Sequence, residues 1–463
     1  MDSFRVLHYD ILLAVLRYCD RSTLCALIGV NRSLYEGAAI SLLREPVVIR
    51  ELGTKLAAVI QFISADNGRR LPYVRNLQIE VLWLSTTSED LLHIHVGGMK
   101  NLQRLTLRHP EVLLSRHPQL ASAFAALEGI EEFAAIYAGQ LTCIMLRSMR
   151  SRLRRVWLDG NTTLKALPDP VEMLSQMSPS LEELECGALW IHTHSVAPYP
   201  IFPNMRKFHI EGVRSPITSR YADAFPGLTH LLIVSPEGDI LQGIVQTAGP
   251  DPHPHNIGPR PTWRALREVV GATIDVYHLG LRHHVPCLRV EVSRLMQDEV
   301  SFLSTVLDNL RPVNLSLSMP TAFLSGTDKD GHSLAALLST PAAMGLSCLE
   351  LYAACFSGER SCVAELPNLL ENPLTAARRL SLGTLVIHWT SRLAMTPSDA
   401  EESIRFVNHL LEQVPSLKTA ELRSHCRYDI YSLHDDRPFE VTRAVRPERA
   451  WEEEQSTIRD TFA

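Results

Sequence analysis

The amino-acid sequence predicts an α/β fold: three N-terminal helices followed by a curved solenoid, with parallel strands on its concave face and helices on its convex face. Three observations support this prediction. Short segments of the pattern apolar-x-x-apolar-x-apolar recur along most of the chain. Apolar stretches with helical spacing lie between these segments. The first 45 residues lack this alternation and contain three short runs of helical spacing instead.

The composition is that of a globular protein without a nucleic-acid or membrane partner. Of the 463 residues, 46% are hydrophobic and 21% are charged, which is close to the average for globular domains. A net charge of −6 gives no basic footprint for nucleic acid. No apolar run approaches the roughly 20 residues that span a bilayer, and the first residues do not follow the secretory-signal pattern. We therefore expect a protein of the cytoplasm, the nucleus or both.

Neither the cysteine pattern nor a search for catalytic motifs indicates an enzyme. Nine cysteines occur, none of them in a C-x-x-C pair, which argues against a disulfide framework and a zinc finger. Phosphate-binding glycine loops, the G-x-S-x-G elbow and the H-E-x-x-H zinc motif are absent from the sequence. Three H-x-H pairs occur without a carboxylate or cysteine set that would complete a metal site. We expect neither catalysis, nor a cofactor, nor a metal.

Three short helices are expected before residue 46. The first covers residues 10–18 and the second follows a cap at Asp20 or Ser22. The third follows a cap at Asn31. Such short helices bury little apolar surface by themselves, so this unit is expected to lean on the next domain or on a partner.

The recurring apolar pattern predicts strands at a regular spacing. The middle apolar residues of its clearest copies are Leu77, Leu105, Phe133, Val156, Leu184, Phe208 and Leu231. They are 28, 28, 23, 28, 24 and 23 residues apart, within or beside the range of about 20–29 residues for leucine-rich repeats. Further copies are expected at 346–351, 377–382 and 417–422, with weaker ones near Leu266 and Val313. An unrelated α/β domain whose strands begin with similar residues remains the alternative.

Helices are expected between these strands. Apolar stretches of helical spacing cover 119–127, 141–149 and 171–177. The clearest helix is late: Thr396 caps it, Pro397 opens it and Pro415 ends it. Its predicted apolar stripe consists of Ile404, Val407, Leu410, Leu411 and Val414. A proline two residues before the strand recurs in the segments 178–181, 202–205, 225–228, 285–288 and 414–417.

Two segments interrupt the repeats and fix the predicted domain boundaries. Residues 235–262 contain ten glycines and prolines and are expected to form an inserted loop or linker. Residues 434–463 form a charged tail, which fits either a frayed helix or a disordered segment. The predicted domains are a helical unit at 1–46, an irregular solenoid at 47–433 and this tail.

Residues 7–32 resemble an F-box. The positions that carry the family's residue type are Leu7, Ile11, Leu12, Leu16, Tyr18, Asp20, Leu24, Leu27, Val30 and Arg32. His8 stands where the family usually has proline. The resemblance covers about a tenth of the chain. An F-box followed directly by leucine-rich repeats is similar to fungal F-box proteins with degenerate repeats.

This resemblance implies the substrate-recognition subunit of an SCF-type ubiquitin ligase. The F-box would dock on a Skp-family adaptor, which links it to cullin, and the repeats would bind a protein substrate of unknown identity. The expected core and adaptor-binding residues are Leu7, Ile11, Leu12, Leu16, Leu24, Leu27 and Val30, and the sequence does not separate core from contact. The alternative is a leucine-rich-repeat interaction scaffold in which the helical unit only caps the repeats.

Candidate substrate-binding residues lie between the buried strand positions, because alternate side chains of a strand point to opposite faces. They are Arg75, Gln78, Gln103, Thr106, Trp157, Glu182, Glu185, Lys207 and His209. Their chemistry is mixed, so the sequence indicates no substrate class, and the charged members fit a solvated face equally well.

Overall fold

The structure is a computed structural model that places most of the chain. The residues it describes are 9–50, 54–82, 84–160, 168–187, 200–211, 218–234, 263–292, 299–320, 323–324, 333–354, 366–390, 397–425 and 440–445. Leu7, His8, Thr396 and the predicted insertion at 235–262 lie outside this part of the chain. The chain divides into two compact units. Unit 1 comprises residues 1–214 and 223–227, and unit 2 comprises residues 215–222 and 228–463.

Unit 1 begins with the three predicted helices. They are α1 (Tyr9–Leu16), α2 (Arg21–Ile28) and α3 (Arg32–Arg44). The Asp20 carboxylate accepts the Thr23 N–H at 2.7 Å, and the Asn31 side chain accepts the Leu34 N–H at 2.9 Å. Both predicted caps are therefore confirmed, with Asp20 rather than Ser22 beginning the second helix.

The rest of unit 1 alternates strands with helices. Its strands are β1 (Val47–Arg50), β2 (Asn76–Glu80), β3 (Arg104–Arg108), β4 (Glu132–Ala138), β5 (Arg155–Gly160), β6 (Glu183–Cys186) and β7 (Lys207–Glu211). Its helices are α4 (Thr54–Ser64), η1 (Leu71–Tyr73), α5 (Thr86–Val96), α6 (Pro110–Arg116), α7 (Pro118–Ala125), α8 (Gln140–Ser148), α9 (Pro170–Met173) and η2 (Ser175–Met177), while α10 (Thr218–Ala224) is shared with unit 2. Neighbouring strands pair in parallel in chain order.

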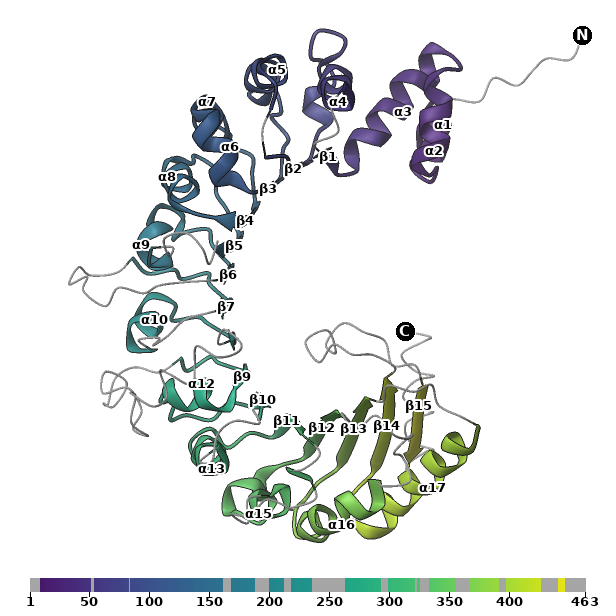
Figure 1. Cartoon of the computed structure of the whole chain (residues 1–463), viewed down its shortest axis with the longest axis vertical. Helices are drawn as coiled ribbons and strands as arrows, with labels where there is room; N and C mark the ends of the chain where they lie inside the picture. The colour runs from purple at the N-terminus through teal and green to yellow at the C-terminus, as the bar shows by residue number, and fades with distance from the viewer. Residues whose placement is uncertain are drawn as a thin grey trace, which may run out of the picture. The chain divides into compact units, whose positions relative to one another are not determined.

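The strand register of unit 1 agrees with the predicted repeat. Leu77 pairs with Leu105, Leu105 with Phe133, and the series continues to Phe208 without a slip at these positions. All these side chains are buried against the helices. The strands lie along one side of the unit and the helices along the other (Figure 1). Because strands pack about 4.8 Å apart and helices need about 10 Å, such a unit bends with its strands inside.

Unit 2 has the same alternation. Its strands are β8 (His230–Val234), β9 (Glu268–Ala272), β10 (Cys287–Glu291), β11 (Asn314–Pro320), β12 (Cys348–Ala354), β13 (Thr384–Thr390), β14 (Thr419–His425) and β15 (Glu440–Val445). Its helices include α12 (Thr273–His278), α13 (Glu299–Leu310), α15 (Leu334–Leu338), η4 (Pro341–Gly345), α16 (Leu366–Ala377) and α17 (Pro397–Gln413). Strands β8 to β14 pair in parallel, and β15 pairs antiparallel with β14.

Four details differ from the sequence-based expectations. The predicted strand at 377–382 is wrong: it covers the end of α16 and the segment before β13, and the paired strand residue is Leu385. Strand β1 precedes the first predicted copy. Strand β15 lies within the predicted tail, as neither a helix nor a disordered segment. Ile404 is exposed on α17, where Ser403 and Phe406 are buried instead, because the stripe is rotated on the helix.

None of the helices in the part of the chain that the structure describes is long and apolar enough to cross a membrane.

Candidate interaction surfaces

The helical unit separates the residues that the sequence grouped together. Leu16 and Leu24 are only 1% exposed and, with Ala38, form the core of α1–α3. Leu12 and Leu27 are partly buried and pack against this core. Of the seven expected adaptor-binding residues, those four are thus core or core-flanking, and Leu7 lies outside the described residues.

Ile11 and Val30 are the exposed members of the set, at 53% and 64% exposure. Val15 and Tyr18 are also exposed. Ile11, Val15 and Tyr18 are four and three residues apart, so they lie along one face of α1 and the turn that continues it. We call these three residues the α1 face. Helical spacing from Ile11 is the signal that could have added Val15 and Tyr18 to the predicted set.

The helical unit is attached to the first repeat through Arg70. This side chain is almost completely buried, and its guanidinium carbon lies 4.6 Å from the ring centroids of both Tyr35 and Phe62. It donates hydrogen bonds to the Tyr35 hydroxyl and, at 3.1 Å, to the Phe62 carbonyl oxygen. It also pairs with Asp66 at 3.1 Å. Helix α3 is therefore held against the α4–η1 segment, with its position fixed by a buried cation.

The outward-facing side chains of the unit 1 strands form rows across the sheet. One row, which we call the charge row, consists of Arg104, Glu132, Arg155, Glu183 and Lys207. Arg104 and Arg155 both pair with Glu132, and Arg155 does so at 2.9 Å. Glu183 lies 3.8 Å from Arg155 and 3.1 Å from Lys207. Each charge in this row therefore has an opposite neighbour on the next strand.

The next row, the middle row, consists of Gln78, Thr106, Ala134, Trp157, Glu185 and His209. Five of the predicted substrate-binding residues thus share one row: Gln78, Thr106, Trp157, Glu185 and His209. Lys207 belongs to the charge row, and its neighbour Glu183 holds it.

The remaining predicted residues lie at the entry of the strands. The Gln103 N–H donates to the Arg75 carbonyl oxygen at 2.8 Å, so these two residues are adjacent on consecutive repeats. Glu182, also at a strand entry, forms two hydrogen bonds with Arg154, at 2.9 and 3.0 Å. Exposed pairs of this kind contribute little to stability.

Two carboxylates flank Trp157 in unit 1. Asp159 is two residues further along β5 and therefore on the same face, and Glu185 is the cross-strand partner of Trp157 on β6. Burial, and next the negative charge of Glu185, raise the pKa of Asp159 above its usual value. His209 Nδ1 lies 3.1 Å from a Glu185 oxygen.

Unit 2 carries a polar cluster on β12–β14 that the sequence did not predict. We call Glu350, Tyr352, His388, Glu421 and Arg423 the β12–β14 cluster. His388 Nε2 lies 2.8 Å from Glu350 Oε1, and the His388 ring stacks on Tyr352 with centroids 3.9 Å apart. Arg423 pairs with Glu421 at 2.7 Å and lies 3.9 Å from Glu350.

The ionisation of the β12–β14 cluster reflects these contacts. Burial opposes the charge of Glu350, but hydrogen bonds from His388 and Tyr352 outweigh it, and the pKa of Glu350 is lowered. Burial, and next the charge of Glu350, raise the pKa of Tyr352. His388 and Tyr352 are buried. The cluster therefore satisfies its polar groups internally, and its contacts are those of a packed polar network.

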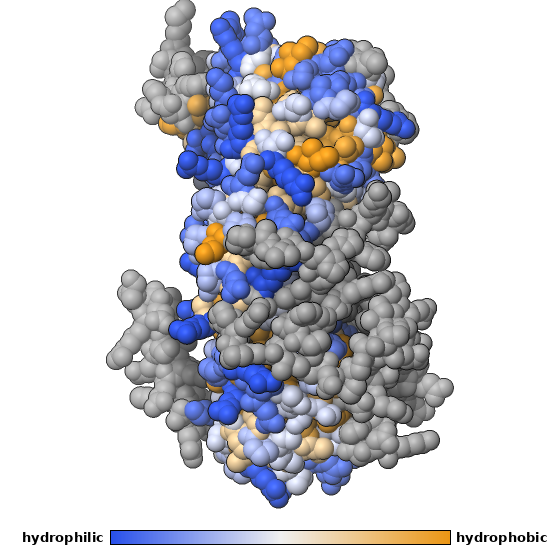
Figure 2. Space-filling model, turned by 90° about the vertical axis from the view of Figure 1, so that its left-hand side faces the viewer, coloured by the Kyte–Doolittle hydropathy of each residue, from blue (hydrophilic) through white to orange (hydrophobic). Residues whose placement is uncertain are grey.

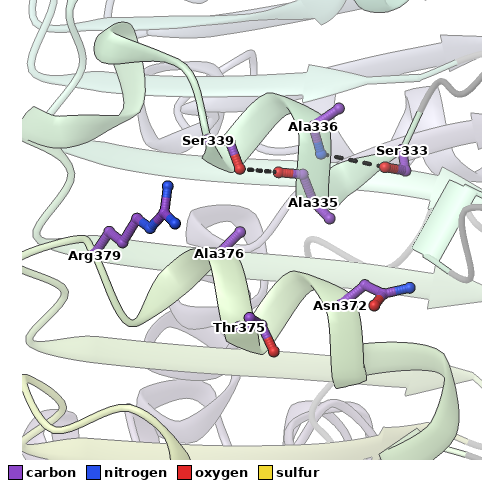
Figure 3. A pocket seen from close by; sticks show the side chains of 8 residues that line it. All are labelled: Ser333, Ala335, Ala336, Ser339, Asn372, Thr375, Ala376 and Arg379. Carbon is purple, nitrogen blue, oxygen red and sulfur yellow. Dashed lines mark hydrogen bonds between the residues drawn. The ribbon is translucent and has the colours of Figure 1, made fainter.

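The helices present fewer candidate binding features than the strand faces. A groove of about 410 Å³ lies between α15 and α16 and is lined by Ser333, Ala335, Ala336, Ser339, Asn372, Thr375, Ala376 and Arg379 (Figure 3). Ser339 donates to the Ala335 carbonyl oxygen and Ser333 accepts the Ala336 N–H, so both hydroxyls bond within α15. Hydrophobic side chains gather in the upper part of the face that Figure 2 shows. On the unit 1 helices, Ile94 of α5, Val112 of α6 and Ile144 of α8 are exposed.

Within the residues that the structure describes, no group of three or more histidine, cysteine or acidic side chains could hold a metal ion. No protein-family model matches this chain, and no curated protein matches it.

Proposed function

We propose that this chain is the substrate-recognition subunit of an SCF-type ubiquitin ligase. In this proposal the α1–α3 unit docks on a Skp-family adaptor linked to cullin, and the strand–helix repeats bind the protein substrate. The ligase chemistry belongs to other subunits, so the chain itself needs neither a catalytic residue nor a cofactor. The complex would act in the cytoplasm, the nucleus or both.

The α1 face is the observation that carries the proposal. Ile11, Val15 and Tyr18 are exposed although Leu16 and Leu24 already supply the core of the same small unit. Fully burying one large apolar side chain contributes about 1.5–3 kcal/mol. A line of such residues on a helix is typical of helix-mediated recognition, in which the apolar face of the helix lies in a partner's groove.

The repeats support the second half of the proposal. A stack of strand–helix units offers an extended strand face whose outward side chains vary freely while the inward ones keep the core. In unit 1 this face presents the charge row and the middle row. A receptor needs such a surface at a distance from its docking helices.

A binding measurement with a Skp-family adaptor tests the proposal. The full chain is titrated with the purified adaptor by isothermal calorimetry, and we expect a Kd in the micromolar range or tighter. The double variant Ile11→Asp, Val15→Asp introduces two charges into the α1 face and should weaken binding by at least about 100-fold, from about 3 kcal/mol of lost burial.

The control is Ile94→Asp, which introduces one charge at an isoleucine on α5 of the same unit that is more exposed than Ile11, at 67% against 53%. It should leave the Kd unchanged within twofold. Equal losses in the two variants, or an adaptor that does not bind the unaltered chain, would contradict the proposal.

A second candidate function is an interaction scaffold in which α1–α3 only cap the repeats. The buried Arg70 contact with Tyr35 favours it, because a cap must be held firmly against the first repeat. This candidate predicts no adaptor binding. It also predicts that deleting residues 1–46 destabilises unit 1 without removing any partner of the strand face.

A further inference from the structure

Trp157 is an exposed aromatic residue on the outward-facing side of β5 in unit 1. The residue is 42% exposed. Its cross-strand neighbour on β4 is the small residue Ala134, and its neighbour on β6 is Glu185. An exposed tryptophan beside a small residue on a sheet face is an open stacking platform, and such residues dominate many interfaces.

The charges next to Trp157 differ from those of the charge row. In the charge row every carboxylate pairs with an arginine or lysine. Among the described residues, no arginine or lysine lies within ion-pair distance of Asp159 or Glu185. Glu185 contacts His209 at 3.1 Å, and a histidine carries charge only when it is protonated. The two carboxylates beside Trp157 are therefore not neutralised by a permanent cation of the described chain.

The nearest cation on the same strand does not fill this role. Arg155 lies two residues before Trp157, but it belongs to the charge row. There it lies 2.9 Å from Glu132 and 3.8 Å from Glu183. The raised pKa of Asp159 has burial as its main cause and the charge of Glu185 as its second cause. The second cause, the negative charge of Glu185, also makes a positive charge beside Asp159 favourable.

We infer that Trp157, Asp159 and Glu185 form a binding site for an arginine or lysine side chain of a protein partner. The aromatic face attracts a cation through its quadrupole, and the two carboxylates complement its charge. A partner segment would place one basic side chain over the indole between the two acids. The inference gives the substrate class of the proposed receptor as a protein segment with an exposed basic residue. It therefore rests on the proposed function.

The charge complementarity also decides between classes of partner. Nucleic acid presents phosphate, which would meet Asp159 and Glu185 with like charge, and the net charge of the chain is −6. A protein segment offers the guanidinium or ammonium group that fits. The neighbouring charge row is internally paired, so it adds little attraction for a second basic residue.

A titration followed at Trp157 itself tests the site. The full chain contains six tryptophans. The indole N–H resonance of Trp157 is assigned in a ¹⁵N spectrum as the one missing from Trp157→Phe. The probe is an end-capped glycine–serine peptide with one central arginine, and the matched control peptide has citrulline, its neutral isostere, at that place. We expect a saturable shift of the Trp157 resonance with the arginine peptide and at least about tenfold weaker binding of the citrulline peptide.

Three variants separate the site from general electrostatics. Asp159→Asn and Glu185→Gln should each weaken binding of the arginine peptide about fivefold. Glu131→Gln removes the same charge from unit 1 at the entry of β4, at a carboxylate 3.9 Å from Arg154, and should change the affinity less than twofold. Thermal unfolding checks that each variant folds.

An unmoved Trp157 resonance, equal binding of the two peptides, or an equal loss in Glu131→Gln and Glu185→Gln would overturn the inference. The adaptor is absent from this titration, and the Ile11→Asp, Val15→Asp variant should bind the arginine peptide normally. Failure of the site and failure of the proposed function are therefore distinguished.

Discussion

The strand faces of the two units use the same framework in different ways. In β2, β3, β5 and β6 of unit 1 the outward-facing side chains are exposed or half-buried, and the charges of the charge row pair across the surface. In unit 2 the strands β11 to β14 are each seven residues long, and Tyr352, Val386 and His388 are buried although they point outward.

Strand length accounts for part of this difference. The paired positions Leu315, Leu349, Leu385 and Ala420 are 34, 36 and 35 residues apart, whereas in unit 1 the steps are 23 to 30 residues. Strand β4 of unit 1 is also seven residues long, but β11 to β14 are four consecutive strands of this length, which gives each central side chain neighbours both along and across the sheet. The comparison teaches that the unit 1 strands leave outward-facing groups accessible to solvent, while β12 and β13 of unit 2 use equivalent positions for packing.

The largest expected contrast is between two aromatic residues. Tyr352→Ala removes a buried ring that stacks on His388, and should lower the free energy of unfolding of unit 2 by about 3 kcal/mol. Trp157→Ala removes a ring that is 42% exposed, and should lower that of unit 1 by less than about 1 kcal/mol. Chemical denaturation followed by hydrogen exchange reports each unit separately. Comparable losses in the two variants would remove the distinction between the faces.

A smaller effect is expected from the acid of the β12–β14 cluster. Glu350→Gln replaces a carboxylate that His388 and Tyr352 stabilise, and should lower stability at pH 7 by about 1–2 kcal/mol. Because the folded-state pKa of Glu350 lies below its usual value, its contribution is present above that value and is lost as the pH falls through the folded-state pKa.

The pH dependence of this variant provides the check. The difference between the unaltered chain and Glu350→Gln should shrink as unfolding is measured at progressively lower pH. A difference that stays constant with pH would show that Glu350 is not held by its hydrogen bonds.

The smallest effect on the free energy of unfolding is expected from a substitution of Asp159. Its sign is opposite to that of the Glu350 substitution. The folded-state pKa of Asp159 is raised, so its contribution to stability is present at low pH and is lost as the pH rises through the folded-state pKa. Asp159→Asn should therefore be more stable than the unaltered chain at pH 7, with the gain disappearing in acid. Thermal unfolding across this range measures it, and a variant less stable than the unaltered chain at neutral pH would contradict the electrostatic interpretation.

Much of the unit 1 framework could be predicted from the sequence, because each copy there has three apolar positions that the core requires. Leu77, Leu105 and Phe133 pair as the spacing predicts. The error at 377–382 has a physical reason: Ala377, Leu380 and Leu382 are all buried at a helix end and a strand entry, so they match the pattern without forming a strand. Strand β1 was missed because Arg44 stands three residues before Val47, where the pattern has its first apolar residue.

The interaction surfaces were predictable only in part. Apolar residues surround α1 on most sides, so periodicity alone could not show that Leu12 faces the core while Ile11 faces outward. The residues of the middle row could be predicted from the alternation of side chains along the predicted strands. The β12–β14 cluster could not be predicted in this way, because its contacts depend on the register between β12 and β13. The wrongly predicted strand at 377–382 concealed the pairing of Tyr352 with His388.

A crossed binding measurement tests the account most directly. Adaptor and arginine peptide are each titrated into two double variants of the full chain. The first variant carries Ile11→Asp and Val15→Asp, and the second carries Asp159→Asn and Glu185→Gln. The account predicts that the first variant loses the adaptor and keeps the peptide, and that the second loses the peptide and keeps the adaptor. Loss of both ligands in either variant, or of neither, would contradict a molecule with a helical docking face and a separate strand face for its substrate.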